Sequence, residues 1–226
     1  MTSWIALAAA VAAKDLRVEF RTRERIVVMG AFIVLAGVLF NYAIDRTAVH
    51  PREIAAGLVW VTIVLSGLLG LGRTFELEKE DGAMDALLAA PLPRDALFVG
   101  KVMANTLLLW GVAFFTLAVF WLFFQLQMPG NPLPLFGVLL LGTTGFAAMG
   151  TLFGGITAGT RMQESLLPVL LFPLVVPLIT FGVRATADLL AGFPPEHSAP
   201  SLRVLGAFTL IALTAGVGLF RFIVED

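Results

Sequence analysis

Long apolar runs make up most of the chain, and six of them are long enough to cross a lipid bilayer. A membrane-spanning helix needs about 20 predominantly apolar residues. The pattern therefore predicts an all-α, polytopic membrane protein in which residues 1–226 form a single transmembrane domain. The six predicted spans are 26–44, 54–72, 102–126, 133–158, 166–183 and 204–220.

One polar stretch between the spans, 73–101, has the pattern of a folded element rather than of a flexible linker. Asp81 stands where a helix N-cap belongs, directly ahead of the helix-forming run 82–90. Asp85 lies in the first turn, where a negative charge suits the positive end of the helix dipole. Pro91 stops the helix. We therefore expect a short helix held between two membrane spans.

This short helix has one apolar side, and it follows a run of acidic residues that we call the acidic collar. Met84, Leu87 and Leu88 are spaced i, i+3 and i+4, so they form a single stripe. A solvated loop with a chance stripe is the alternative, but the agreement of cap, stripe and proline favours a helix that docks a cytoplasmic partner. The candidate docking residues are Glu80, Asp81, Gly82, Met84, Asp85, Leu87, Leu88 and Pro91.

The first residues of the chain, 1–25, predict an amphipathic helix in the membrane interface. Lys14, Arg17 and Arg21 recur at helical spacing, and Phe20 falls on the opposite side. Such a helix lies with its apolar side in the lipid and its Lys and Arg side chains towards lipid phosphates. A ragged extension of the first span is the alternative interpretation.

The distribution of Lys and Arg predicts the orientation of the chain. If both termini lie on one side, that side carries eleven Lys and Arg residues and the other side carries four. The positive-inside rule then places both termini, and the stretch 73–101 with them, in the cytoplasm. The segment 184–201 is expected to be a periplasmic, Pro/Gly-rich loop with a short helix at the interface.

Composition narrows the function classes further. Charged residues make up 14% of the chain, against roughly 25% in water-soluble domains. The net charge of −1 argues against nucleic-acid binding, and the absence of Cys excludes disulfides and thiolate sites. No Walker A pattern is present, so a separate subunit would hydrolyse any ATP, and neither enzymatic activity nor a catalytic residue is expected. His50 and His197 fall in predicted outward loops, where a lone His is usually solvated, so no metal site is predicted.

The fifth predicted span contains Pro168, Pro173 and Pro177, which remove three backbone hydrogen-bond donors. In lipid the freed carbonyls need partners, so this segment is expected to face protein or a cavity. Two interpretations stay open here. One is a broken helix that lines a pathway, and the other is a kinked helix that only packs.

Small and polar residues within the spans predict close helix packing. Gly150 and Gly154, like Gly155 and Gly159, are four residues apart, which lets helices approach closely. Packing within one bundle is the favoured interpretation, and a homodimer face is the alternative. Asn105 is expected to make an interhelical hydrogen bond.

Several segments together resemble the cytochrome c maturation protein B (CcmB) family of heme-exporter permease subunits. The block 80–91 is similar to the cytoplasmic motif of type-2 ABC exporter permeases in general, and the segment 172–177 makes the likeness more specific. The likeness extends along nearly the whole chain. The segments that carry it are 14–17, 56–61, 73–75, 80–91, 100–104, 140–143, 172–177 and 181–182.

Three positions depart from the family pattern. Thr144 stands where a proline is frequent, which predicts a less bent fourth span. Asn105 occupies a position where histidine is common, so a role in heme handling does not carry over to it. Gly72 replaces a usual glutamate, which removes one charge from the acidic collar.

The resemblance implies a type-2 ABC exporter permease in the bacterial inner membrane, with its coupling helix docked on a cytoplasmic ABC ATPase subunit. It also implies a heme-handling membrane subunit, a small single-span subunit and a periplasmic heme chaperone as partners. Heme would be the cargo, and ATP would be bound by the partner. A type-2 permease for another cargo, such as a lipid-linked saccharide or a drug, is the main alternative.

Overall fold

The computed structural model describes residues 3–44, 51–75, 93–158 and 163–223, and no strand occurs in these ranges. Within them, six helices are long and apolar enough to cross a membrane, which confirms the predicted all-α, six-span architecture. The helices are α1 (Trp4–Thr22), α2 (Glu24–Ala43), α3 (Pro51–Leu71), α6 (Arg94–Phe124), α7 (Leu133–Thr157), α8 (Gln163–Leu190) and α9 (Pro195–Ile223).

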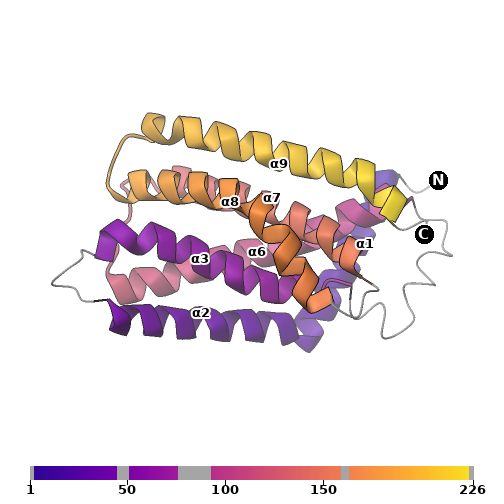
Figure 1. Ribbon diagram of the computed structural model, residues 1–226, viewed down its shortest axis with the longest axis horizontal. Helices are drawn as coiled ribbons and strands as arrows, with labels where there is room; N and C mark the ends of the chain where they lie inside the picture. The colour runs from indigo at the N-terminus through magenta and orange to yellow at the C-terminus, as the bar shows by residue number, and fades with distance from the viewer. Residues whose placement is uncertain (1–2, 45–50, 76–92, 159–162, 224–226) are drawn as a thin grey trace.

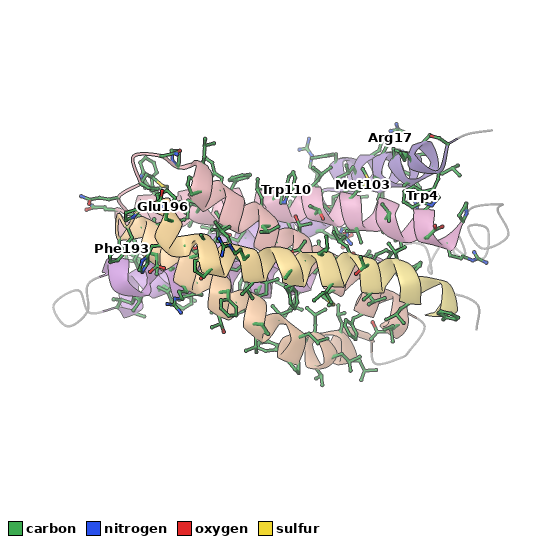
Figure 2. The ribbon with its side chains drawn as sticks, turned by 90° about the horizontal axis from the view of Figure 1, so that it is seen from above. Trp4, Arg17, Met103, Trp110, Phe193 and Glu196 are labelled. Carbon is green, nitrogen blue, oxygen red and sulfur yellow. The ribbon has the colours of Figure 1, made fainter. Side chains whose placement is uncertain are left out.

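The six long helices run side by side as a bundle, with α7 and α3 on the inside (Figure 1). α7 packs against α3, α6, α8 and α9, while α2 and α9 are the least buried of the six. The start of α1 and the end of α9 lie at the same end of the bundle, which we call the α1 end (Figure 1). Figure 2 places Trp4 and Arg17 at the α1 end, and Phe193 and Glu196 at the opposite, far end.

α1 is a helix of its own, which excludes a ragged extension of the first span. It is separated from α2 by Arg23, whose φ of 57° lies in the left-handed region that non-glycine residues rarely adopt. α6 begins at Arg94, ahead of the predicted start at 102. Its 31 residues give a length of about 46 Å, which exceeds the roughly 30 Å of bilayer hydrocarbon. α1 packs on the first turns of this long helix.

At the far end, the structure differs from the loop expected over 184–201. α8 continues to Leu190 and α9 begins at Pro195, so only 191–194 link the two helices. Gly192 lies in this link with φ of 83°, a left-handed conformation that favours glycine directly after a helix. The predicted loop was too long because charges after an apolar run mark the membrane boundary, whereas the helix itself continues beyond it.

Candidate functional site

The candidate docking residues predicted from the sequence fall between two described segments and lie outside the described residues. They are Glu80, Asp81, Gly82, Met84, Asp85, Leu87, Leu88 and Pro91. What the structure does describe is how the chain leaves the bundle at Phe75 and returns to it at Pro93. Both points lie at the α1 end, and the residues that hold them form the candidate site.

The chain leaves the bundle through a tight turn after α3. The backbone N–H of Thr74 donates to the carbonyl of Leu71 at 3.1 Å. Phe75 follows and is only 1% exposed. Its ring centroid lies 6.2 Å from that of Phe220 on α9, and an added Cβ at Gly154 of α7 would sit 3.5 Å from the same ring. The exit point is therefore anchored by aromatic packing inside the bundle.

The chain returns at the start of α6, where α1 holds it. The Trp4 indole N–H donates to Asp95 Oδ2 at 2.9 Å. One turn further on, the backbones of the two helices come together at Gly100, where a Cβ would lie 2.6 Å from the carbonyl oxygen of Ala8 and 2.6 Å from Val11 Cβ. A side chain at position 100 would separate α1 from α6, so glycine is required for this contact.

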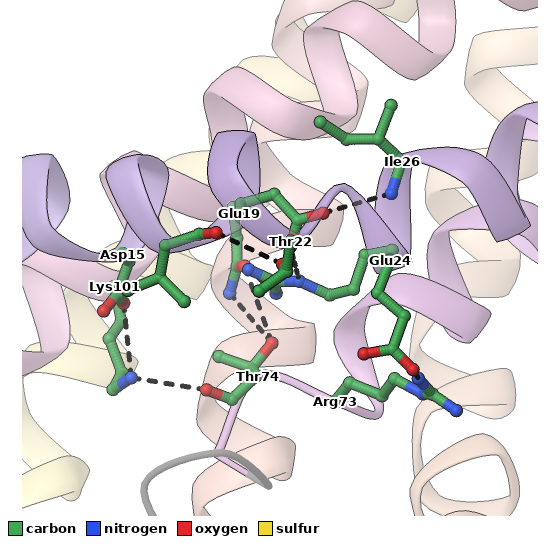
Figure 3. A network of polar contacts seen from close by, with 11 residues as sticks. Asp15, Glu19, Thr22, Glu24, Ile26, Arg73, Thr74 and Lys101 are labelled. Atoms are coloured by element: carbon green, nitrogen blue, oxygen red, sulfur yellow. Dashed lines mark hydrogen bonds and ion pairs between the residues drawn. The ribbon is translucent and has the colours of Figure 1, made fainter.

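Lys101 joins the two anchoring points to each other. Its side chain is 1% exposed, and its Nζ lies 3.3 Å from Asp15 Oδ2 on α1 and 3.3 Å from the carbonyl oxygen of Thr74 (Figure 3). The same ammonium lies 4.7 Å from the centroid of the Phe75 ring, within the range of a cation–π contact. One buried cation thus touches α1, α6 and the point where the chain leaves α3.

A second buried pair extends the network to α2. Glu19, which is 2% exposed, accepts hydrogen bonds from Arg25 Nε and from the backbone N–H of Ile26 (Figure 3). Arg25 also donates to Asn105 Oδ1 at 3.4 Å, so the charged pair is linked to α6. The buried charges of Glu19 and Lys101 therefore each have a partner of opposite sign, which lowers the cost of removing them from water.

Asn105 lies at the centre of the network. Its Nδ2 donates to Thr74 Oγ1 at 3.2 Å and to Thr151 Oγ1 of α7 at 2.9 Å, which confirms the predicted interhelical hydrogen bonding.

Outside this buried network, Arg73 pairs with Glu24 at 2.6 Å in an exposed ion pair. We call the network of Asp15, Glu19, Arg25, Thr74, Lys101 and Asn105 the foot cluster. Paired charges at the junction of several helices hold those helices in place.

The predicted interface residues lie on a side of α1 that faces away from α6. Arg17 and Arg21 are exposed, and Lys14 Nζ lies 3.1 Å from Asp15 Oδ1. Next to this basic side, Ile5 and Phe20 are 71% and 62% exposed and form an apolar side. The helix is amphipathic as predicted, and its insertion in the membrane interface stays a prediction.

The three prolines of the fifth span lie inside α8, which continues from Gln163 to Leu190 without interruption. Pro173 and Pro177 are on the exposed side of the helix, and α8 is bent along its length (Figure 1). Proline causes such bends because it removes a helical hydrogen bond and its ring clashes with the preceding turn. Pro168 is partly buried. α8 is thus a kinked helix rather than a broken one, and a role in a pathway stays a prediction.

Three of the glycines with helix-packing spacing are in contact with side chains of the same chain. An added Cβ at Gly150 would strike Leu71, and one at Gly155 would lie 2.9 Å from Phe220. Gly154 faces the Phe75 ring, as described above. These contacts support packing within one bundle. Gly159 lies outside the described residues.

The segments that carry the family likeness meet in two places. Segments 14–17, 73–75 and 100–104 come together at the foot cluster. Segments 56–61, 140–143 and 181–182 meet around Trp60, which is fully buried between Gly142 and Gly182. The foot cluster does not follow from the sequence pattern, because Lys101 enters that pattern only as one of the charges between two spans. The segments 14–17 and 100–104 were the signal that could have pointed to it.

The histidines add little to the site. His50 lies outside the described residues. His197 is exposed at the far end and stacks on Phe193, with ring centroids 5.1 Å apart.

Six helices that are long and apolar enough to cross a membrane define a polytopic α-helical membrane protein, and the foot cluster links α1 to α2, to α6 and to the end of α3. The family model described as CcmB protein matches residues 6–221, and the chain belongs to that family. It is 34% identical over 200 residues to heme exporter protein B of Paracoccus denitrificans, covering 88% of this chain and 90% of the relative. It is 32% identical to heme exporter protein B of Rhodobacter capsulatus, covering 80% and 84%, and 30% identical to that of Escherichia coli K12, covering 91% of each chain.

Proposed function

We propose that this chain is the transmembrane permease subunit of an ABC-type heme exporter complex required for c-type cytochrome biogenesis. The observation that carries the proposal is the similarity along 80 to 91% of the chain to relatives named heme exporter protein B. In this role the chain couples ATP hydrolysis in a partner subunit to heme transport or to release of a heme-loaded chaperone.

The geometry of the α1 end suits such a coupling. The segment 76–92 joins Phe75 to Pro93. Phe75 is buried in the bundle, and the start of α6 is held on α1 by the Trp4–Asp95 hydrogen bond and by the close approach at Gly100. A partner that moves this segment therefore moves α3 and α6 directly, because little slack remains at either end. The docking stripe of Met84, Leu87 and Leu88 provides the surface for the partner, a cytoplasmic ABC ATPase subunit.

The remaining parts of the proposal follow from this role. The protein lies in the bacterial inner membrane, with both termini and the segment 76–92 in the cytoplasm, where ATP is available. Its partners are the ATPase, a heme-handling membrane subunit, a small single-span subunit and a periplasmic heme chaperone. ATP is bound and hydrolysed by the ATPase subunit and not by this chain.

A change in the docking stripe tests the proposal. The double variant Leu87→Glu/Leu88→Glu places two charges on the stripe, so we expect the ATPase subunit to be lost when the complex is purified from membranes. The matched control Leu87→Met/Leu88→Met keeps the stripe apolar and should retain the ATPase. Both variants should insert into the membrane in equal amounts, and heme absorbance of the wild-type complex reports the cargo. Unchanged co-purification of the ATPase with the charged variant would contradict the docking role.

A further inference from the structure

α1 contacts the start of α6 at two points, and the second of them is also bonded to the point where the chain leaves α3. Trp4 bonds to Asp95 where the chain returns, and Asp15 pairs with Lys101, which also bonds to Thr74 where the chain leaves. Asp15 lies eleven positions after Trp4, which is about 16 Å along the helix. α1 therefore lies along the start of α6, where the chain returns, and is linked to the point where the chain leaves through Lys101.

The apolar side chains on the contact side of α1 are small, so polar bonds add to the packing that holds it on α6. The buried apolar residues on this side are Ala8, Val11 and Ala12, which carry little hydrophobic surface. Among the described helices, α1 packs only against α6 and α2. The ion pair of Asp15 with Lys101 and the close approach at Gly100 together fix α1 on α6.

The C-terminal end of α1 is joined to α2 without a flexible linker. Only Arg23 separates the two helices, and its backbone N–H donates to the carbonyl of Glu19 at 2.6 Å. The Glu19 side chain accepts from both Arg25 and the N–H of Ile26 in the first turn of α2. A displacement of α1 is thus transmitted to α2 instead of being absorbed at the junction.

We propose that α1 is a force-transmitting bar that carries movement of the segment 76–92 to the first membrane-spanning helix, with Lys101 as its positioning residue. This inference rests on the proposed function, because it assumes that an ATPase moves the segment. It adds a second route of coupling. The direct route runs through α3 and α6, and the additional route runs through α1 into α2.

A substitution of Lys101 separates this role from folding. In Lys101→Met the apolar side chain fills the same buried space and keeps its contact with the Phe75 ring. Asp15 is not left as an isolated charge, because Lys14 lies 3.1 Å from its other oxygen. The matched control is Lys14→Met, which removes the other cation from the same carboxylate on the exposed side, where 43% of the Lys14 side chain is accessible.

The test uses the full complex with its ATPase subunit in lipid nanodiscs. Since the chain has no Cys, spin labels at Ile5→Cys on α1 and Leu210→Cys on α9 report one defined distance. In the wild type and in Lys14→Met we expect the distance distribution to shift between nucleotide-free and vanadate-trapped complexes. In Lys101→Met we expect bound ATPase and hydrolysis within about twofold of wild type, no shift, and at least about fivefold less matured c-type cytochrome in cells.

The outcomes separate the inference from the proposed function. If the distance distribution of Lys101→Met shifts as much as that of the wild type and cytochrome maturation is normal, the inference is overturned and the permease role is left intact. A wild-type chain that retains no ATPase would overturn the permease role and the inference with it. If Lys101→Met fails to accumulate, Trp4→Phe removes the hydrogen bond to Asp95 at a site that is 40% exposed. We expect that variant to reduce the shift as well, and an undiminished shift would contradict the proposal.

Discussion

Replacing Gly142 by alanine should destabilise the protein, because the new methyl group would collide with a ring that cannot move. Trp60 is fully buried, and its indole N–H donates to Thr186 Oγ1 at 2.9 Å. A Cβ at Gly142 would strike Cη2 of this ring and lie 3.1 Å from Cζ3. On the α8 side, an added Cβ at Gly182 would lie 2.6 Å from Cε2 of the same ring. The indole is therefore held between two helices with no free space for it to shift.

The expected magnitude follows from two opposing effects. Overpacking a filled core costs about 1–3 kcal/mol. Alanine is about 0.8–1.0 kcal/mol more favourable than glycine within a helix. Gly137 lies on the same helix, and an added Cβ there meets nothing within 4 Å, so Gly137→Ala measures the helix term alone. We expect Gly142→Ala to be about 1–3 kcal/mol less stable than Gly137→Ala.

Unfolding in mixed detergent micelles, followed by circular dichroism as SDS is added, measures both free energies. A third variant tests the cause, because Trp60→Phe removes the benzo-ring atoms that the new methyl group would strike. In that background the cost of Gly142→Ala should fall to less than half. The reasoning is refuted if Gly142→Ala is as stable as Gly137→Ala, or if its cost is the same in the Trp60→Phe background.

Three further predictions concern the ends and the faces of the bundle. Phe75→Ala should lower the free energy of unfolding by about 3–5 kcal/mol, because it leaves a cavity in a closed aromatic cluster. A loss below about 1 kcal/mol in the same SDS titration would contradict this packing. Pro173→Ala should raise the free energy of unfolding, because it restores a helical hydrogen bond. The same variant should lower cytochrome maturation. A lower free energy of unfolding would argue that Pro173 does not cause the bend of α8. Changing Lys14, Arg17 and Arg21 together to Gln should reduce the phosphatidylglycerol retained in purified protein by mass spectrometry, whereas unchanged retention would contradict the interfacial role of α1.

Hydropathy predicted the number and type of the helices but not where they end. The six spans are apolar along their length, and this signal depends only on the lipid environment. The helices themselves continue further, since α6 begins at Arg94 and α8 reaches Leu190. Charged and polar residues in those extensions leave the membrane without breaking the helical hydrogen-bond pattern. The apolar pattern therefore locates the spans but not the helix termini.

The foot cluster could be predicted only in part. Asn105 was expected to bond between helices, because a polar side chain inside an apolar span needs a partner. Its actual partners, Thr74 and Thr151, are distant in the sequence. The pairing of Lys101 with Asp15 spans 86 residues, and apart from the family likeness of segments 14–17 and 100–104 the sequence contains no signal that relates them. The burial of these charges depends on how α1 folds back onto α6, which follows from tertiary packing rather than from local pattern.

The central claim is that the segment 76–92 faces the cytoplasm at the α1 end, where an ATPase can dock on it. Because the chain has no Cys, single cysteines introduced at three positions report sidedness with a membrane-impermeant maleimide. Glu196→Cys marks the far end, Arg17→Cys marks the α1 end, and Asp85→Cys marks the docking segment. The account predicts that in spheroplasts only Glu196→Cys is labelled, and that in inside-out vesicles only Arg17→Cys and Asp85→Cys are labelled. Labelling of Asp85→Cys in intact spheroplasts would contradict the account.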